Sequence, residues 1–285
     1  MNNFGGDWTE SKIEILVEYA QAYLSIMNIN ANRYNWKLLY FDGFAGSGFI
    51  KKGNDKSQKI IIGAAKRILD IEQPRSFDLY YFVEKQTKNA KELLEKVIKN
   101  YEHKTIKIAT TDCNVKLKSM ATFLKSPKGK KHRVLAYIDP CGMQVNWESL
   151  MTLKELNVDV WLLVPTGIGI NRLLKRNGEI YDTWLERLEI FLGMPKEEII
   201  DYFYNKKIVP TLFGDEIVTS KEQGAIERSA ELYKKRLQQI FKFVTNPYIL
   251  KNKSNSTMFH FYMGSNNKTA HKIGNEIIKK YNIAN

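Results

Sequence analysis

Five short apolar runs, separated by stretches with helical periodicity, constrain the fold of this chain more than any other feature of its sequence. The runs lie at residues 38–41, 79–83, 106–109, 134–138 and 158–164. They are nearly continuous and lack strict alternation, which is typical of parallel strands buried on both faces. The stretches between them, at 60–71, 89–100, 115–124 and 147–156, predict helices. Repeated strand–helix–strand units predict an α/β fold with a doubly wound, mostly parallel sheet.

The remaining segments depart from this repeat. Ser11 and Glu14 have the spacing of a capping box and open an amphipathic helix, so residues 1–35 are predicted to form a helical lead-in. Residues 171–243 have a helical pattern, with one long helix near 220–243, and predict a helical insertion. Runs at 248–250 and 258–263 predict a closing antiparallel hairpin, followed by a helix at 268–281. Residues 36–170 and 244–285 therefore predict one Rossmann-like domain.

Composition limits the kinds of partner. Forty-four Lys and Arg against 31 Asp and Glu give a net charge of +13, which favours a polyanion such as nucleic acid. The alternative explanation for this charge is the general enrichment in Lys of proteins from AT-rich bacterial genomes. The best apolar stretch, 158–170, is interrupted and shorter than the roughly 18 residues of a spanning helix. With no signal-peptide pattern and only two cysteines, the chain is expected in the cytoplasm and not in a membrane.

A glycine-rich turn, DGFAGSG at residues 42–48, follows the first apolar run. Glycines let a backbone approach a ligand closely, and a carboxylate at the strand end can hold an ammonium group. The predicted cofactor contacts here are Asp42, Phe44, Gly46 and Gly48. A tight turn with a purely structural role is the alternative. Five parallel strands with a terminal antiparallel hairpin are the order expected of class I methyltransferases, so S-adenosylmethionine (SAM) is the expected cofactor.

Two further acidic residues follow the next two runs. Glu84 ends the second run, where an acidic residue can accept hydrogen bonds from both ribose hydroxyls. Asp112 follows the third run, where class I methyltransferases bind the adenine amino group. Asp112 could equally cap the helix at 115–124, and the two roles are compatible. The polar, Lys-rich loop at 49–59 separates the glycine turn from Glu84 and is interpreted as a lid.

The fourth run ends in Asp139-Pro140-Cys141-Gly142. This resembles the Asp-Pro-Pro-aromatic motif of methyltransferases that act on exocyclic amines, in which the acidic side chain and a backbone carbonyl accept hydrogen bonds from the target amine. Asp139 and Pro140 are therefore the predicted catalytic residues, although Cys141 and Gly142 replace the second proline and the aromatic residue. A cysteine nucleophile, as in cytosine-C5 methyltransferases, and an ordinary buried thiol are the alternatives for Cys141.

Several motifs go beyond a generic fold: Trp8-Thr9 and Lys12 in the lead-in helix, FAGSG at 44–48, VNW at 145–147, and the segments at 162–167 and 171–174. With them the chain resembles the bacterial three-Cys-motif partner family over nearly its whole length, from the lead-in helix to the terminal hairpin. The resemblance implies a class I methyltransferase-like fold. It also implies a partner, a three-Cys-motif protein similar to radical-SAM enzymes.

Basic loops follow several predicted strands on the cofactor's edge of the sheet. Lys51 and Lys52 follow the first strand, and Arg172 and Arg176 follow the fifth, and these four are the predicted substrate-binding residues. The denser basic run at 125–133 precedes the fourth strand and belongs to the opposite edge. Three aromatic residues of the insertion could stack on a base or belong to the core: Tyr181, Trp184 and Tyr204.

Three functions fit these patterns to different degrees. The first is a SAM-dependent methyltransferase acting on nucleic acid. The second is a non-catalytic, methyltransferase-like module that binds nucleic acid for its partner. An NAD-dependent oxidoreductase fits the glycine turn but not the terminal hairpin. The four histidines lack metal-ligand spacing, so no metal site is expected.

Overall fold

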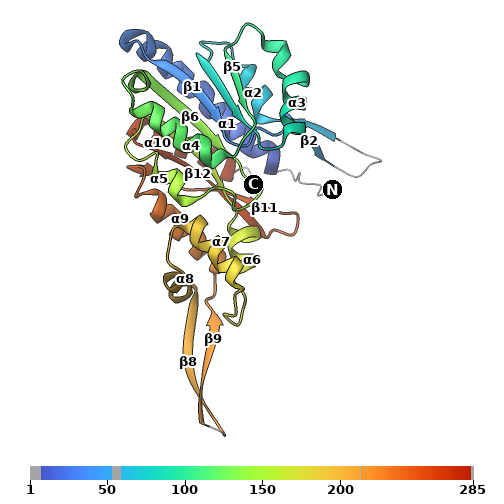
Figure 1. Cartoon of the computed structure of the whole chain (residues 1–285), viewed down its shortest axis with the longest axis vertical. Helices are drawn as coiled ribbons and strands as arrows, with labels where there is room; N and C mark the ends of the chain where they lie inside the picture. Colours follow the sequence, from blue (N-terminus) through green and yellow to red (C-terminus); the bar gives the residue numbers. More distant parts are fainter. Residues whose placement is uncertain (1–7, 53–58, 213, 284–285) are drawn as a thin grey trace.

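The computed structural model describes residues 8–52, 59–212 and 214–283. Within these residues, eight strands form the central sheet in the order β10-β12-β7-β6-β1-β4-β5, and β11 also pairs with β12 (Figure 1). The strands are β1 (Lys37–Asp42), β4 (Leu79–Val83), β5 (Ile106–Ala109), β6 (His132–Ile138), β7 (Val158–Val164), β10 (Phe243–Val244), β11 (Tyr248–Lys251) and β12 (Thr257–Ser265).

Strand direction identifies the type of sheet. Strands β5, β4, β1, β6 and β7 are parallel, whereas β12 runs antiparallel to β7, β10 and β11. The antiparallel β12 lies between β7 on one side and β10 and β11 on the other, and β11 and β12 form the closing hairpin. The predicted doubly wound, mostly parallel sheet with a terminal antiparallel hairpin is confirmed.

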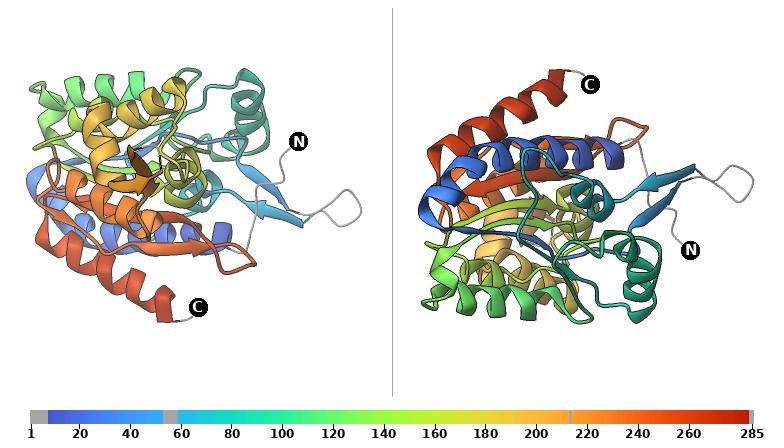
Figure 2. Two further views of the ribbon diagram at one scale, coloured as in Figure 1. Left: turned by 90° about the horizontal axis from the view of Figure 1, so that it is seen from below. Right: turned by 90° about the horizontal axis from the view of Figure 1, so that it is seen from above.

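Helices cover both faces of the sheet because side chains alternate along each strand. Leu38 and Tyr40 of β1 pack into one core with α1 (Trp8–Tyr34), α2 (Ala64–Leu69), α3 (Thr87–Lys96) and α10 (Lys268–Ile283). Leu39 and Phe41 pack into the other core with α4 (Cys113–Lys125), α5 (Trp147–Met151) and helices of the insertion. Figure 2 shows α1 and α4 on opposite sides of the sheet. Of the helices in the described ranges, none has the length and apolar character needed to cross a bilayer.

The segment 171–243 is helical at both ends and forms a hairpin between them. A π-helical turn, η3 (Thr166–Ile170), leads from β7 into its helices, which are α6 (Asn171–Leu173), α7 (Asp182–Leu192), α8 (Lys196–Phe203) and α9 (Ala225–Leu237). Strands β8 (Tyr204–Thr211) and β9 (Gly214–Lys221) pair antiparallel and extend away from the body at the bottom of Figure 1. The long helix expected near 220–243 is thus confined to α9. Both faces of the hairpin are largely exposed, so its sequence lacks the apolar stripe that identifies a strand.

The segment after the glycine turn also forms a hairpin. Strands β2 (Phe49–Lys52) and β3 (Lys59–Ile62) pair antiparallel, so the helix expected at 60–71 is reduced to α2, after Gly63. Consecutive β-branched residues at 60–62 favour a strand over the first turn of a helix. The tip of the expected lid, residues 53–58, lies outside the described residues.

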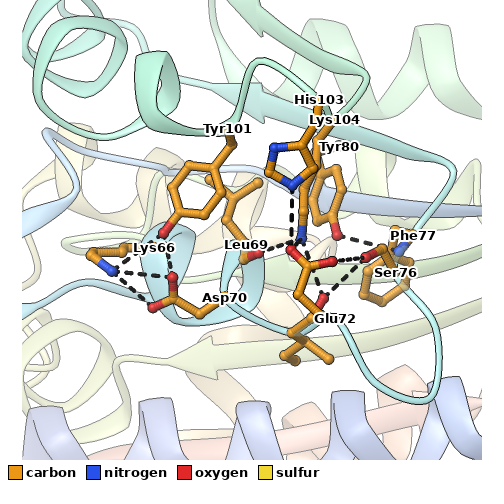
Figure 3. A network of polar contacts seen from close by, with 11 residues as sticks. Lys66, Leu69, Asp70, Glu72, Ser76, Phe77, Tyr80, Tyr101, His103 and Lys104 are labelled. Atoms are coloured by element: carbon orange, nitrogen blue, oxygen red, sulfur yellow. Dashed lines mark hydrogen bonds and ion pairs between the residues drawn. The ribbon is translucent and has the colours of Figure 1, made fainter.

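A polar network joins the end of α2 to the start of β5, at the sheet edge opposite the strand ends that carry Asp42 and Glu84 (Figure 3). The Lys104 ammonium donates to the Ile71 carbonyl at 3.3 Å and pairs with Glu72 at 2.8 Å. Its side chain is 3% exposed and also lies over the rings of Tyr80 and Tyr101. This lysine therefore caps the chain after α2 and has a structural role. In the described ranges, the 3₁₀ helices η1 (Ile98–Tyr101) and η2 (Gly129–Lys131) precede β5 and β6.

Candidate functional site

Four acidic residues lie at the carboxyl ends of adjacent parallel strands. Asp42 ends β1, Glu84 follows β4, Asp112 follows β5 and Asp139 follows β6. Because these strands are neighbours, their ends share the edge at which open α/β sheets bind ligands. The edge contains two adjoining clefts of about 670 and 190 Å³, the larger lined by Glu84 and Asp112 and the smaller by Asp42. Residues that line both clefts are Phe44, Gly46, Asp139 and Cys141.

Two glycines of the turn differ in their surroundings, because Gly48 is closely packed and Gly46 faces open space. Gly46 and Gly48 both have left-handed backbone, with φ of 62° and 81°. A Cβ at Gly48 would lie 2.6 Å from Val97 Cγ2, so packing leaves no room for a side chain. A Cβ at Gly46 would meet no atom within 4 Å, because this residue faces the clefts. A ligand can therefore approach the backbone at Gly46.

Glu84 connects the end of β4 to this turn. Its Oε2 accepts a hydrogen bond from the Gly46 amide at 2.9 Å, and its Oε1 accepts one from the Gln86 amide at 2.7 Å. Each carboxylate oxygen has a second lone pair. Ribose hydroxyls can therefore donate to the same oxygens without breaking either bond.

Asp42 is a buried carboxyl group, 1% exposed, at the base of the smaller cleft. Its Oδ1 accepts a hydrogen bond from the Phe44 amide at 3.0 Å, and the Tyr40 hydroxyl lies 3.5 Å from its Oδ2. Burial raises the pKa of Asp42 to about 7, the Phe44 hydrogen bond opposes this shift, and the carboxylates of Asp139 and Glu84 reinforce it. The site therefore favours a bound cation beside this carboxylate.

The raised pKa predicts that Asp42 destabilises the fold at neutral and alkaline pH. A carboxyl group whose pKa is higher in the folded state than in the unfolded chain favours folding when it is protonated. The free energy of unfolding therefore falls as the pH rises from about 4 to about 7. Asp42→Asn should remove this pH-dependent loss, because an amide side chain does not ionise. Its oxygen can still accept the hydrogen bond from the Phe44 amide. We expect the stability gained by the variant to be about 2 to 3 kcal/mol larger at pH 8 than at pH 5. Urea unfolding of both proteins at the two pH values measures this difference, and an equal gain at both would contradict it.

Asp112 caps α4, as one of its two predicted roles requires. Its Oδ1 accepts hydrogen bonds from the Asn114 amide at 2.8 Å and from the Asn114 side chain at 2.9 Å, and Lys85 lies 3.2 Å from its Oδ2. Burial acts to raise the pKa of Asp112, but these bonds outweigh it and hold the pKa below its usual range. The cap and a place in the larger cleft coexist, so an adenine contact stays a prediction. Arg187 of α7 lines the same cleft, a contribution of the insertion that the sequence did not indicate.

Asp139 is fixed by two partners from different elements. Lys12 Nζ of α1 lies 2.6 Å from its Oδ2, and the Tyr137 hydroxyl donates to the same oxygen at 2.8 Å. The Lys12 side chain is 7% exposed. Pro140, the other predicted catalytic residue, is buried beside it and lines the smaller cleft. A lysine next to the buried Ile13 and Ile15 of α1 is the signal from which the pairing of Lys12 could have been suspected.

The two cysteines differ in exposure but share a raised pKa. Cys113 is buried, and burial raises the pKa of its thiol well above the usual range. Cys141 lines both clefts, and partial burial together with the Asp139 carboxylate raises the pKa of its thiol. Reactive cysteines have lowered pKa values. The cysteine-nucleophile alternative is therefore disfavoured.

The predicted substrate-binding residues lie in two separate elements. Arg172 in α6 and Arg176 after it are exposed. The backbone of Lys51 and Lys52 lies in β2, and their side chains fall outside the described residues.

The three aromatic residues of the insertion separate into two groups. Tyr204 is buried, and its hydroxyl donates to the Lys175 carbonyl at 2.8 Å, so it belongs to the core. Tyr181 is 58% exposed, contacts Trp184 edge to face, and has the Lys175 ammonium 3.5 Å from its ring centre. The pair formed by Tyr181 and Trp184 stays a candidate for base stacking.

Among the residues that the structure describes, no group of three or more His, Cys, Asp or Glu side chains is placed to bind a metal ion. His260 is buried and bonds Thr166 at 2.7 Å, and burial lowers its pKa to about 4. This histidine is a neutral core residue.

No protein-family model and no curated protein matches the chain. Its fold is similar to that of a Legionella pneumophila protein, with 15% identity over 92% of this chain and 98% of that chain and a TM-score of 0.44. Trm1 from Pyrococcus horikoshii, in complex with SAM, is 13% identical over 90% of this chain and 64% of its own, with a TM-score of 0.36. A SAM-dependent methyltransferase from Clostridium acetobutylicum is 9% identical over 88% and 92%, with a TM-score of 0.34.

Proposed function

We propose that this chain is a SAM-dependent methyltransferase. The observation that carries the proposal is the row of carboxylates at the ends of β1, β4 and β5, beside a glycine turn that is open at Gly46. Glu84 would accept the ribose hydroxyls, Asp112 would contact the adenine, and Asp42 would hold the ammonium of the methionyl end. The clefts suit these groups, because carboxylates are acceptors for hydroxyls and ammonium groups and the exposed backbone at Gly46 leaves room for them.

Asp139 would orient the acceptor. The bound cofactor supplies an electrophilic methyl group, and an amine must align its lone pair with the carbon–sulfur bond. An amino group that donates to the Asp139 carboxylate and to the Pro140 carbonyl is held in one direction. Lys12 and Tyr137 in turn hold the carboxylate, so the acceptor site is preorganised by α1 and β6.

Nucleic acid is the proposed acceptor class. The net charge of +13 favours a polyanion, and Arg172, Arg176 and the exposed Tyr181 come from the chain that follows β7, whose end lies at the cofactor's edge. Transfer of a labelled methyl group from SAM to total RNA or DNA, with loss of the label after nuclease treatment, tests this proposal. Incorporation into neither, by a protein that binds SAM, would contradict it.

The basic edge predicts a salt dependence that can be mapped. If four to six phosphates are neutralised, the logarithm of the association constant should fall with log salt at a slope of about −3 to −5. Replacement of Lys51, Lys52, Arg172 and Arg176 by Gln should flatten this slope. The same change at Lys128, Lys130 and Lys131, which precede β6 at the opposite edge, is the control. Equal effects of the two sets in a fluorescence-anisotropy titration would show that the charge acts only as a diffuse field.

A partner of the three-Cys-motif type remains part of the proposal, through the sequence resemblance. A non-catalytic, nucleic-acid-binding module is the second candidate function, because Cys141 and Gly142 replace the proline and the aromatic wall of the amine-methylating motif. The two candidates differ in outcome. The module would bind SAM or nucleic acid without transferring a methyl group, both alone and with its partner.

A further inference from the structure

Lys12 is the basic side chain of the smaller cleft. Of the described residues that line this cleft, no other is Lys, Arg or His. Lys12 reaches the cleft from the N-terminal part of α1, and its ammonium lies 2.6 Å from the Asp139 carboxylate. A buried charge is costly unless it is paired. Because even a paired buried lysine costs desolvation that an apolar side chain would avoid, its place in the cleft favours a role in ligand binding.

The side chains that line the smaller cleft indicate which end of the cofactor would bind there. Under the proposed function, the adenosine occupies the larger cleft beside Glu84 and Asp112, and the methionyl end occupies the smaller one. That end carries an ammonium group and a carboxylate on the same carbon. Asp42 can accept from the ammonium, whereas the carboxylate needs hydrogen-bond donors.

The first amides of the glycine turn are already engaged inside the protein. The backbone N–H groups of residues 43–46 donate, in order, to the Tyr137 carbonyl, the Asp42 carboxylate, the Val83 carbonyl and the Glu84 carboxylate, at 2.9 to 3.0 Å. A ligand carboxylate beside this part of the turn would face amides that already donate hydrogen bonds within the protein. The charged donor that lines the cleft is the ammonium of Lys12.

We propose that Lys12 binds the carboxylate of the methionyl part of the cofactor while it keeps its ion pair with Asp139. The assignment rests on the proposed function and adds a cofactor contact from α1. A lysine ammonium has three N–H donors, so one nitrogen can contact both carboxylates. The same lysine then links the cofactor's amino-acid end to the carboxylate that orients the acceptor.

Decarboxylated SAM isolates this contact, because it retains the adenosine, the sulfonium and the ammonium group and lacks only the carboxylate. Calorimetry should show that the wild-type protein binds SAM at least about tenfold more tightly than decarboxylated SAM, as expected for one lost charge-assisted contact. In Lys12→Met the two ligands should bind within about threefold of each other. Lys12→Arg should retain a preference for SAM.

A matched control is Lys104→Met, which removes another buried, ion-paired lysine at the opposite edge of the sheet. It should keep the wild-type preference even if it lowers stability. A folded Lys12→Met protein that keeps the full preference overturns the assignment. If that variant does not fold, the wild-type comparison decides, and equal affinity for the two ligands overturns it. Absence of SAM binding to the wild-type protein removes the proposed function as well, whereas SAM binding without preference removes only the role of Lys12.

Discussion

Asp139→Asn should reduce methyl transfer at least about 100-fold while SAM affinity changes by less than about threefold. The carboxylate lies between the two clefts, where it would align the acceptor, and the adenosine contacts come from other strands. Asparagine keeps an oxygen for Lys12 and Tyr137, so the local geometry should survive better than after Asp139→Ala. That truncation would remove the carboxylate that pairs with the buried Lys12 ammonium.

Transfer of a labelled methyl group, measured beside SAM calorimetry, separates the two effects. Asp70→Asn is the control, since this carboxylate pairs with Lys66 at 2.9 Å in the network at the opposite edge (Figure 3). Its methyl transfer should stay at the wild-type level. A parallel loss of transfer and of SAM binding in Asp139→Asn would assign Asp139 a structural role instead.

Glu84→Ala should weaken SAM binding by roughly 1.5 to 3 kcal/mol, or about 10- to 150-fold, because two charge-assisted hydrogen bonds to the ribose would be lost. The change also removes the acceptor for the Gly46 amide, which loosens the turn. Glu84→Gln separates these causes, because its amide oxygen can still accept from Gly46 but only one acceptor oxygen remains. We expect Glu84→Gln to bind with intermediate affinity in the same calorimetric experiment.

The control for this pair is Glu72→Ala, which removes a carboxylate bound to Lys104 at the far edge of the sheet. SAM affinity should be unchanged in this variant. Wild-type affinity in Glu84→Ala would remove Glu84 from the site and, with it, the orientation of the cofactor proposed above.

The sequence predicts the parts of this molecule in which burial is strong. Strands such as β6 and β7 are buried on both faces, so their apolar runs are unmistakable, and the rule for strand ends then places Asp42, Glu84 and Asp139 at one edge. The hairpins β2–β3 and β8–β9 lie outside the central sheet. In β8–β9 most side chains are exposed, so no periodicity identifies its strands.

The sequence also could not predict which side chains pair when they are far apart in the chain. Lys12 and Asp139 are 127 residues apart, and only the packing of α1 against the sheet brings them together. The pKa of Asp42 likewise depends on its burial and on Asp139 and Glu84, which come from different strands. Asp112 shows the reverse case, because its helix-capping role is local and its position just before the helical pattern at 115–124 predicts it.

Calorimetric titration of the purified chain with SAM, S-adenosylhomocysteine and NAD tests the central claim most directly. We expect SAM and S-adenosylhomocysteine to bind at one site each, and NAD to bind at least about 100-fold more weakly. NAD shares the adenosine but has no methionyl end for Asp42 and the smaller cleft. Binding of NAD without SAM would contradict the methyltransferase assignment, and so would a chain that binds none of the three.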